Sequence, residues 1–235
     1  MIIIHLNSTL LFIKYALKFF KDEIKVLEIG PDEIPSSYRK KVKIKSIVWD
    51  TIDLSPNYNT TFLAKNEYQF PIEDNSYDII LSGQVIEHVR KIWIWIKELS
   101  RICKVGGHII TINPISYPYH EAPVDCWRIY PEGMKALYEE QGLKIVLSKL
   151  ESLESYQIQR NGFRNIYYGL PAPPDAFLSM GQFIKSLPKK LETPVYFIKS
   201  NINYMRMLLG RPVSCSLDVI TIGMNEKKSF FLFSF

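Results

Sequence analysis

Two carboxylates and a glycine near the start of the chain have the types and spacing needed to bind a nucleoside. Glu28 lies in the apolar run of residues 25–29, Gly30 ends that run, and Asp53 follows Gly30 by 23 positions. A glycine there lets a ligand approach the backbone, and an aspartate after the next strand can accept bonds from both hydroxyls of a ribose. Glu28 could accept a bond from an ammonium group or orient the loop. The alternative is an ordinary turn at each position.

A second group of chemically active side chains lies in residues 113–134, where aromatic, acidic, basic and imidazole groups are densest. Its candidate functional residues are Tyr117, His120, Asp125, Trp127 and Arg128. Asp125 and Arg128 could form an internal pair that fixes the loop, or they could contact a substrate directly. Tyr117 and Trp127 could stack on a sugar or another ring, or they could pack the loop against the domain.

These residues need a scaffold, and the hydrophobic pattern predicts a parallel sheet covered by helices. Short apolar runs alternate with amphipathic stretches, as in α/β folds. Strands are predicted at residues 25–29, 46–54, 77–82, 108–113, 144–150 and 217–224. Helices are predicted at residues 85–103 and 131–141, the second with proline at its start and Gly142 after its end. Ligands of such sheets bind beyond the carboxyl ends of the strands, which is where both groups of residues fall.

The chain of 235 residues is expected to form a single domain. Residues 1–23 are predicted to be an amphipathic helix that packs on the domain, with a membrane-surface helix, and so peripheral membrane contact, as the alternative. Residues 152–211 are rich in proline and aromatic residues. Because long connections inside a compact domain are usually functional or carry helices of their own, this stretch is interpreted as a mostly helical lid or substrate insertion.

Composition excludes several classes of protein. The hydrophobic fraction of 47% and the net charge of +5 indicate a globular chain and no nucleic-acid partner. The three cysteines form no close pair, so neither a disulfide framework nor a metal site is predicted, and a reducing, cytoplasmic location is expected.

The basic run of residues 39–45 is interpreted as a solvated face, with contact to anionic lipid or a phosphorylated acceptor as the alternative. The oligomeric state is not predicted.

Residues 70–89 are the most informative part of the chain. This segment, Phe-Pro-Ile-Glu-Asp-Asn-Ser-Tyr-Asp-Ile-Ile-Leu-Ser followed by Gly-Gln-Val-Ile-Glu-His-Val, resembles a signature of the methyltransferase-11-like branch of the class I S-adenosylmethionine-dependent methyltransferases. Residues 99–107, which end in Gly106-Gly107, are similar to the turn that precedes the fifth strand in that family. The resemblance covers about residues 24–150, and residues 217–224 are similar to the family's final strand.

The resemblance implies a fold, a cofactor and a set of binding residues. The expected fold is a Rossmann-like three-layer α/β sandwich with a mostly parallel seven-stranded sheet whose last strand is antiparallel. The cofactor is S-adenosyl-L-methionine, with Gly30 at its methionine part and Asp53 at its ribose. The implied cofactor-binding residues are Glu28, Gly30, Asp53, Asn66, Ser82, Gly83 and Gln84. His88 is expected to be a structural residue.

The implied reaction is methyl transfer to an oxygen or nitrogen of a small-molecule or glycan-type acceptor. A hydroxyl acceptor must lose a proton, and histidine is the usual proton acceptor near neutral pH, so His120 is the candidate catalytic base. The alternative for His120 is a bond to the loop backbone. The family usually has three alternating glycines after the acidic residue, but here Asp32 and Ile34 occupy the second and third places. Asp32 is expected to crowd the cofactor and to place a negative charge near its carboxylate.

Because of this departure, a catalytically silent methyltransferase fold that acts as a binding or partner subunit is the alternative function. A nicotinamide-dependent oxidoreductase is disfavoured, because residues 30–35 lack the glycine fingerprint that such enzymes need.

Overall fold

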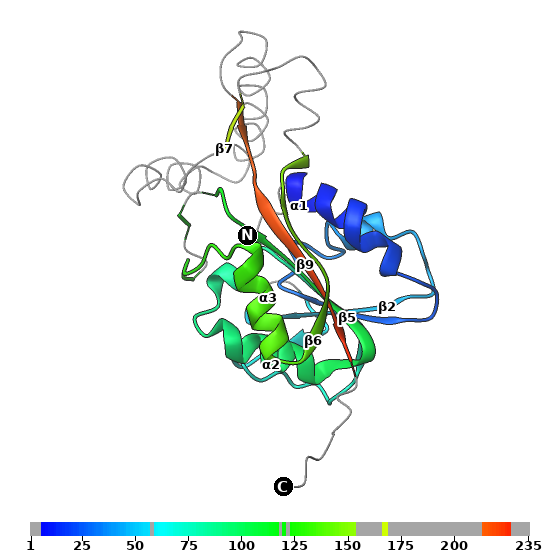
Figure 1. Cartoon of the computed structure of the whole chain (residues 1–235). Helices are drawn as coiled ribbons and strands as arrows, with labels where there is room; N and C mark the ends of the chain where they lie inside the picture. The colour runs from blue at the N-terminus through cyan, green and yellow to red at the C-terminus, as the bar shows by residue number, and fades with distance from the viewer. Residues whose placement is uncertain are drawn as a thin grey trace, which may run out of the picture.

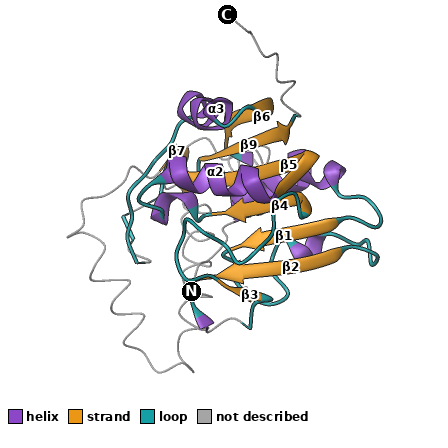
Figure 2. Ribbon diagram, turned by 90° about the horizontal axis from the view of Figure 1, so that it is seen from below, coloured by secondary structure: helices purple, strands orange, loops and turns teal. Residues whose placement is uncertain are grey.

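A computed structural model describes residues 6–56, 59–117, 119–120, 123–153, 166–168 and 213–226. A seven-stranded sheet in the order β3-β2-β1-β4-β5-β9-β6 forms its centre (Figure 2). The strands are β1 (Lys25–Ile29), β2 (Val48–Asp53), β3 (Phe62–Leu63), β4 (Tyr77–Gly83), β5 (Cys103–Pro114), β6 (Leu143–Glu151) and β9 (Asp218–Asn225). The first five strands pair in parallel, and β9 runs antiparallel to both β5 and β6. The predicted fold class is confirmed.

Helical segments cover both faces of the sheet and make the three layers (Figure 1). One face packs against α2 (Ile92–Ile102) and α3 (Pro131–Glu140), which bury Trp95, Leu99 and Tyr138. The other face packs against the N-terminal segment, made of α1 (Leu6–Leu11), the π-helical turn η1 (Phe12–Ala16) and the 3-10 turn η2 (Leu17–Phe19). Its apolar side chains, Leu11, Phe12, Ala16 and Phe20, are buried there.

The structure departs from the sequence predictions at β3 and at the start of α2. The two-residue strand β3 was not predicted, because it is too short to have a pattern. The helix predicted at residues 85–103 begins only at Ile92, and the 3-10 turn η5 (Ile86–His88) precedes it. The Glu87 carbonyl accepts a bond from the Cys126 N–H at 2.7 Å instead of from a helical turn. The distant loop therefore competes successfully with the helix for this backbone.

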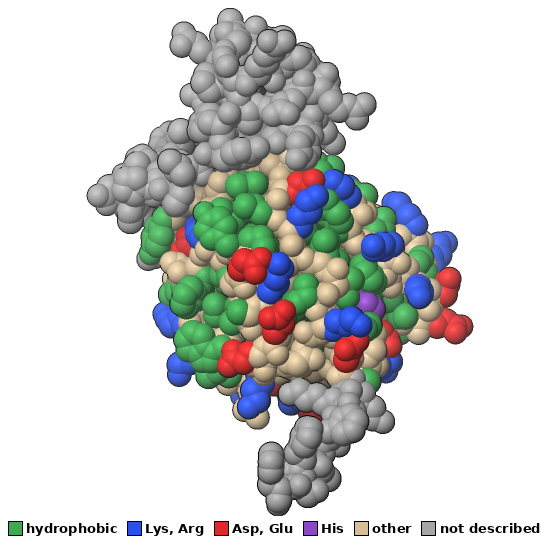
Figure 3. Space-filling view, in the orientation of Figure 1, with side chains coloured by type: hydrophobic (Ala, Val, Ile, Leu, Met, Phe, Trp, Pro, Cys, Tyr) green, Lys and Arg blue, Asp and Glu red, His purple; other side chains and the backbone are tan. Residues whose placement is uncertain are grey.

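The predicted insertion lies outside the described residues, apart from its first two residues and β7 (Ile166–Tyr168). This strand pairs in parallel with β8 (Val213–Cys215), which leads into β9. No helix among the described residues is long and apolar enough to cross a membrane. Basic and acidic side chains are interspersed among apolar ones on the face drawn in Figure 3.

Candidate active site

Three of the predicted cofactor residues meet at the carboxyl edge of the sheet. Ile29 is in register with Ile52 in β2 and with Ser82 in β4, so Gly30, Asp53 and Gly83 are the next residues along three adjacent strands. The Gly30 N–H donates to the Ile52 carbonyl at 3.0 Å, and its φ of 63° is in the left-handed region that favours glycine. The chain therefore turns sharply at Gly30. Gly30 itself adds no side chain to this edge of the sheet.

Asp53 is the partly exposed carboxylate at this edge. The Ser55 N–H donates to its Oδ1 at 2.7 Å. Burial raises the pKa of Asp53, while bonds from the backbone of Ser55 and Leu54 oppose that rise. Asp53 is thus an acceptor at a strand end, as the ribose hypothesis requires.

Glu28 is enclosed by the loop that follows β1. Only 1% of the residue is exposed, and its Oε2 accepts bonds from the Ser36 hydroxyl at 2.6 Å and from the Trp49 indole N–H at 2.9 Å. Burial raises the pKa of Glu28 to about 7, although both hydrogen bonds oppose that rise. Of the two roles considered for Glu28, these contacts favour orienting the loop.

Asp32, which stands in a glycine position of the family pattern, is bound within its own loop. Its Oδ1 accepts a bond from the Ser37 N–H at 2.9 Å, and its Oδ2 accepts one from the Ser37 hydroxyl at 2.5 Å. The Asp32 side chain, at a position where the family usually has glycine, therefore binds back to its own loop. Tyr38, which follows Ser37, is fully buried. A Cβ added to Gly83 would lie 2.2 Å from the Tyr38 hydroxyl oxygen. Glycine is required at position 83 because the Tyr38 ring covers it.

The residues beside Gly83 are buried, and one belongs to a polar network. Gln84 donates through Nε2 to the Ser8 hydroxyl at 2.7 Å and to Asp218 at 3.3 Å. Asn7 donates to the other oxygen of Asp218 at 2.6 Å. Ser82 is 2% exposed. These contacts give the Gln84 side chain a structural function, which joins the N-terminal segment to β9.

Asn66 lies apart from this network, on the exposed connection between β3 and β4. Its Oδ1 accepts a bond from the Tyr68 N–H at 2.8 Å, which forms a tight turn. Asn66 therefore shapes the segment that leads to Phe70. Its predicted position beside the adenine stays a prediction.

The predicted substrate loop is held together by Asp125. Arg128 donates through both terminal nitrogens to this carboxylate, at 2.5 and 2.8 Å. The His120 N–H donates to Asp125 at 2.8 Å, and the His120 Nδ1 lies 3.3 Å from the same oxygen. Burial opposes ionisation of Asp125, but the bonds from Arg128 and His120 outweigh it and hold the pKa of the carboxyl well below its usual range. The internal pair expected from the sequence is present.

Aromatic residues fix the same loop. The Trp127 indole N–H donates to the Val89 carbonyl at 2.9 Å, so Trp127 packs the loop against the domain. The Tyr117 carbonyl accepts a bond from Arg128 at 3.1 Å, and the Tyr117 ring contacts the His120 ring edge to face at 4.9 Å. Tyr130, at the start of α3, is 58% exposed.

The loop brings His120 to two residues that precede α2. Glu87, His88 and His120 each offer a ligand atom, and these atoms lie within 4.8 Å of one another. The rings of His88 and His120 contact edge to face at 4.8 Å. Burial raises the pKa of Glu87 to about 8 and lowers the pKa of His88. Sequence reasoning missed this cluster; the adjacent Glu87 and His88 were a signal, but 32 residues separate His88 from His120.

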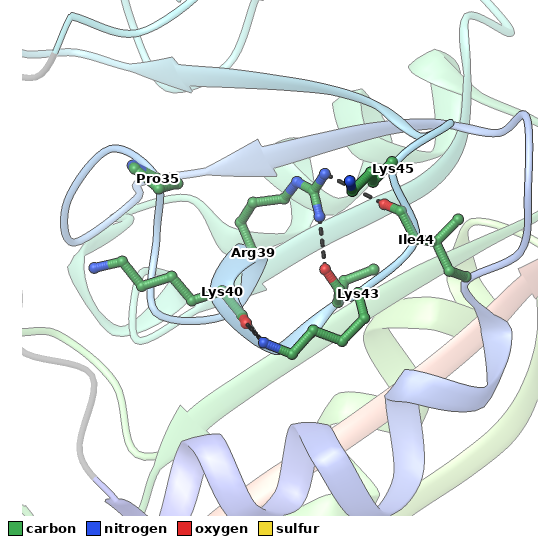
Figure 4. A pocket seen from close by; sticks show the side chains of 7 residues that line it. Pro35, Arg39, Lys40, Lys43, Ile44 and Lys45 are labelled. Atoms are coloured by element: carbon green, nitrogen blue, oxygen red, sulfur yellow. Dashed lines mark hydrogen bonds between the residues drawn. The ribbon is translucent and has the colours of Figure 1, made fainter.

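The basic run of residues 39–45 lines a shallow pocket of about 330 Å³ (Figure 4). Arg39 donates to the carbonyls of Val42 and Ile44 at 2.8 and 3.4 Å, and its guanidinium lies 5.3 Å from the Trp49 ring centre. Lys40 forms an ion pair with Glu33. Arg39 and Lys40 are therefore held by contacts within the loop, and the interpretation of the run as a solvated face stays a prediction.

Comparison with known proteins gives the same class. A family model described as a methyltransferase domain matches residues 36–111. A curated relative from Schizosaccharomyces pombe, described as an uncharacterized methyltransferase, is 24% identical over 115 residues, which are 40% of this chain and 41% of the relative. The matched region thus spans less than half of that relative.

Solved structures share the fold over nearly the whole chain. A SAM-dependent methyltransferase from Archaeoglobus fulgidus is 14% identical, with a TM-score of 0.53 and 92% of each chain covered. Phosphoethanolamine N-methyltransferase 2 from Haemonchus contortus, in complex with S-adenosyl-L-methionine, is 13% identical, with a TM-score of 0.55 and 94% of this chain and 53% of that chain covered. The family match and the shared fold make the chain similar to the class I methyltransferases, as the sequence resemblance predicted.

Proposed function

We propose that this chain catalyses methyl transfer from S-adenosyl-L-methionine to an oxygen or nitrogen of a small-molecule or glycan-type acceptor. One observation carries the proposal. A sharp turn at Gly30, the partly exposed carboxylate of Asp53 and the glycine at position 83 end three adjacent strands of a class I methyltransferase sheet. Ligands of such sheets bind at this edge, so a nucleoside cofactor would be held there.

The residues at this edge fit the cofactor. Asp53 would accept bonds from the ribose hydroxyls, and the turn at Gly30 would leave room for the methionine part. Asp32 is held within its own loop, because both of its carboxylate oxygens accept bonds from Ser37. The cofactor would supply a methyl group on a positively charged sulfur, which an acceptor lone pair can attack directly. Glu28 would act indirectly, by holding the loop in place.

The loop around His120 would prepare the acceptor. In methyl transfer the enzyme mainly supplies alignment and a water-poor site. The Nδ1–H of His120 donates to Asp125, so the imidazole is oriented with Nε2 able to accept a proton from an acceptor hydroxyl. The bidentate bond from Arg128 fixes Asp125, and Trp127 fixes the loop. Arg128 and Asp125 therefore serve as positioning residues.

The acceptor class is supported by solved structures of the same fold whose names state small substrates. One of these, the Haemonchus contortus enzyme, is a phosphoethanolamine N-methyltransferase. The aromatic groups of Tyr117 and Tyr119 beside His120 would suit a ring-containing acceptor. No nucleic-acid partner is proposed.

Radiolabelled methyl transfer tests the proposal. The chain would be incubated with S-adenosyl-L-methionine carrying a labelled methyl group and with panels of sugars, hydroxylated rings and small amines. We expect label in at least one acceptor and release of S-adenosylhomocysteine in equal amount. Cofactor binding without transfer to any panel would favour the catalytically silent alternative, and no cofactor binding at all would refute the proposal.

A further inference from the structure

We propose that Glu87, His88 and His120 form a binding site for one divalent transition-metal cation. The site is built from the short turn η5, which lies in the connection between β4 and α2, and from the loop that follows β5. Its three ligand atoms already lie within 4.8 Å of one another. No metal site was expected from the sequence, because only the cysteines were considered as ligands there.

Glu87 gives the first independent indication of a ligand. It is 1% exposed, and among the described residues neither of its carboxylate oxygens has a hydrogen-bond partner. The His88 Nε2 approaches Oε1 only to 3.8 Å. Burying a carboxylate without partners is unfavourable, so such groups in folded proteins are usually paired or bound to a metal. A cation beside Glu87 would remove this cost.

The two imidazoles are oriented in the way that metal-binding histidines usually are. The His88 Nδ1 lies 2.5 Å from the Val124 carbonyl, which can only accept, so Nδ1 carries the proton and Nε2 presents its lone pair. The His120 Nδ1 lies 3.3 Å from a carboxylate oxygen of Asp125, which is an acceptor, so this ring has the same protonation pattern. A metal-bound histidine characteristically donates its other ring N–H to a carbonyl or a carboxylate. Val124 supplies the carbonyl for His88, and Asp125 supplies the carboxylate for His120.

The spacing requires only small movements. A cation at the centre of a triangle with 4.8 Å sides would lie about 2.8 Å from each corner, whereas zinc bonds to nitrogen and oxygen measure about 2.0–2.2 Å. Each ligand atom would therefore move by about 0.7 Å at most. His120 can make such a movement, because it lies on a loop and 34% of its side chain is exposed.

The ligand set selects the class of metal. Two imidazoles and one carboxylate suit zinc, cobalt, manganese or ferrous iron, whereas magnesium and calcium prefer oxygen ligands alone. Three protein ligands leave at least one position open, as in sites where a metal binds a water molecule or a substrate. The partly exposed side of His120 is where that position would face.

The cation would change the function of His120 within the proposed methyl transfer. A metal-bound His120 Nε2 could not accept a proton, so the cation itself would lower the pKa of a bound acceptor hydroxyl. This part of the inference rests on the proposed function. The binding site does not, because it can be measured without cofactor or acceptor.

Cobalt provides the direct test, because its visible absorption reports the ligands that bind it. Untagged metal-free chain would be titrated with Co²⁺, and zinc would be added afterwards to displace it. We expect one equivalent of Co²⁺ to bind saturably, and zinc to abolish the absorption. Glu87→Gln and His120→Asn should each weaken binding at least about tenfold, and Asp125→Asn should weaken it about 10–100-fold by releasing the His120 ring.

His108→Gln is the matched control, since His108 is a half-buried histidine on β5 whose ring lies tilted against that of Phe19, with the centres 4.6 Å apart. Its binding of Co²⁺ should equal that of the unmodified chain. Thermal unfolding without metal would identify any variant that fails to fold. Of the proposed variants, His120→Asn should disturb folding least, because the His120 side chain is partly exposed. The absence of saturable binding up to about 1 mM Co²⁺, or equal binding by Glu87→Gln, His120→Asn and the control, would overturn the proposal.

Discussion

Glu28→Gln tests whether the carboxylate after β1 is an internal anchor of the loop. In the folded chain Glu28 is buried between Ser36 and Trp49, and burial raises its pKa from 4.5 to about 7. Between these two pH values the folded state keeps a proton that the unfolded state has lost. The free energy of unfolding must therefore fall as the pH rises through this window, and then stay level above about 7.

The size of this effect follows from the pKa difference. Each unit of pKa corresponds to about 1.4 kcal/mol, so the full difference amounts to about 3 kcal/mol. Between about pH 5 and pH 8 the linkage relation gives a loss of roughly 2–3 kcal/mol from Glu28 alone. Glutamine does not titrate, so Glu28→Gln should lose less stability than the unmodified chain over the same range, and the two losses should differ by this amount.

Urea unfolding at the two pH values measures the difference. Other buried acids contribute equally to both proteins, so the comparison isolates Glu28. Glu73→Gln, which changes an exposed carboxylate in the loop before β4, is the matched control and should behave like the unmodified chain. A stability difference between Glu28→Gln and the unmodified chain that stays the same at both pH values would refute the account of Glu28 as a buried, protonatable anchor.

Three further predictions concern the cofactor edge and the acceptor loop. Gly83→Ala should lower the free energy of unfolding by about 1–3 kcal/mol, because its Cβ would overlap Tyr38; urea unfolding would check this, and unchanged stability would mean that the ring moves freely. Asp32→Gly should cost about 1–3 kcal/mol of stability through its two lost bonds to Ser37, and tighter cofactor binding in a calorimetric titration would instead support crowding. His120→Ala should lower turnover and leave cofactor affinity unchanged, and a parallel loss of affinity would place His120 in the cofactor site.

The sheet and its functional edge could be predicted because they depend on local patterns. Apolar runs predict the strands that carry Gly30, Asp53 and Gly83. Because these strands pair in parallel, their carboxyl ends must meet at one edge of the sheet. The Asp125–Arg128 pair was also predictable, because Arg128 follows Asp125 by only three positions.

The missed features depend on contacts between distant segments. Tyr38 covers Gly83 only because the loop after β1 folds under β4, and nothing in the local sequence around Tyr38 indicates this. Glu87 was expected in a helix, but the loop residue Cys126 binds its carbonyl and leaves its side chain beside His120. Gln84 was expected to face the cofactor, whereas its amide binds Ser8 and Asp218, which are far away in the chain.

The central claim is that S-adenosyl-L-methionine binds at the edge formed by Gly30, Asp53 and Gly83. Isothermal titration of the chain with this cofactor, beside the Asp53→Ala variant, tests it most directly. We predict saturable 1:1 binding that Asp53→Ala weakens by roughly 1.5–3 kcal/mol, the scale of hydrogen bonds to a charged group. No heat of binding at about millimolar cofactor, or equal affinity of the two proteins, would contradict the claim.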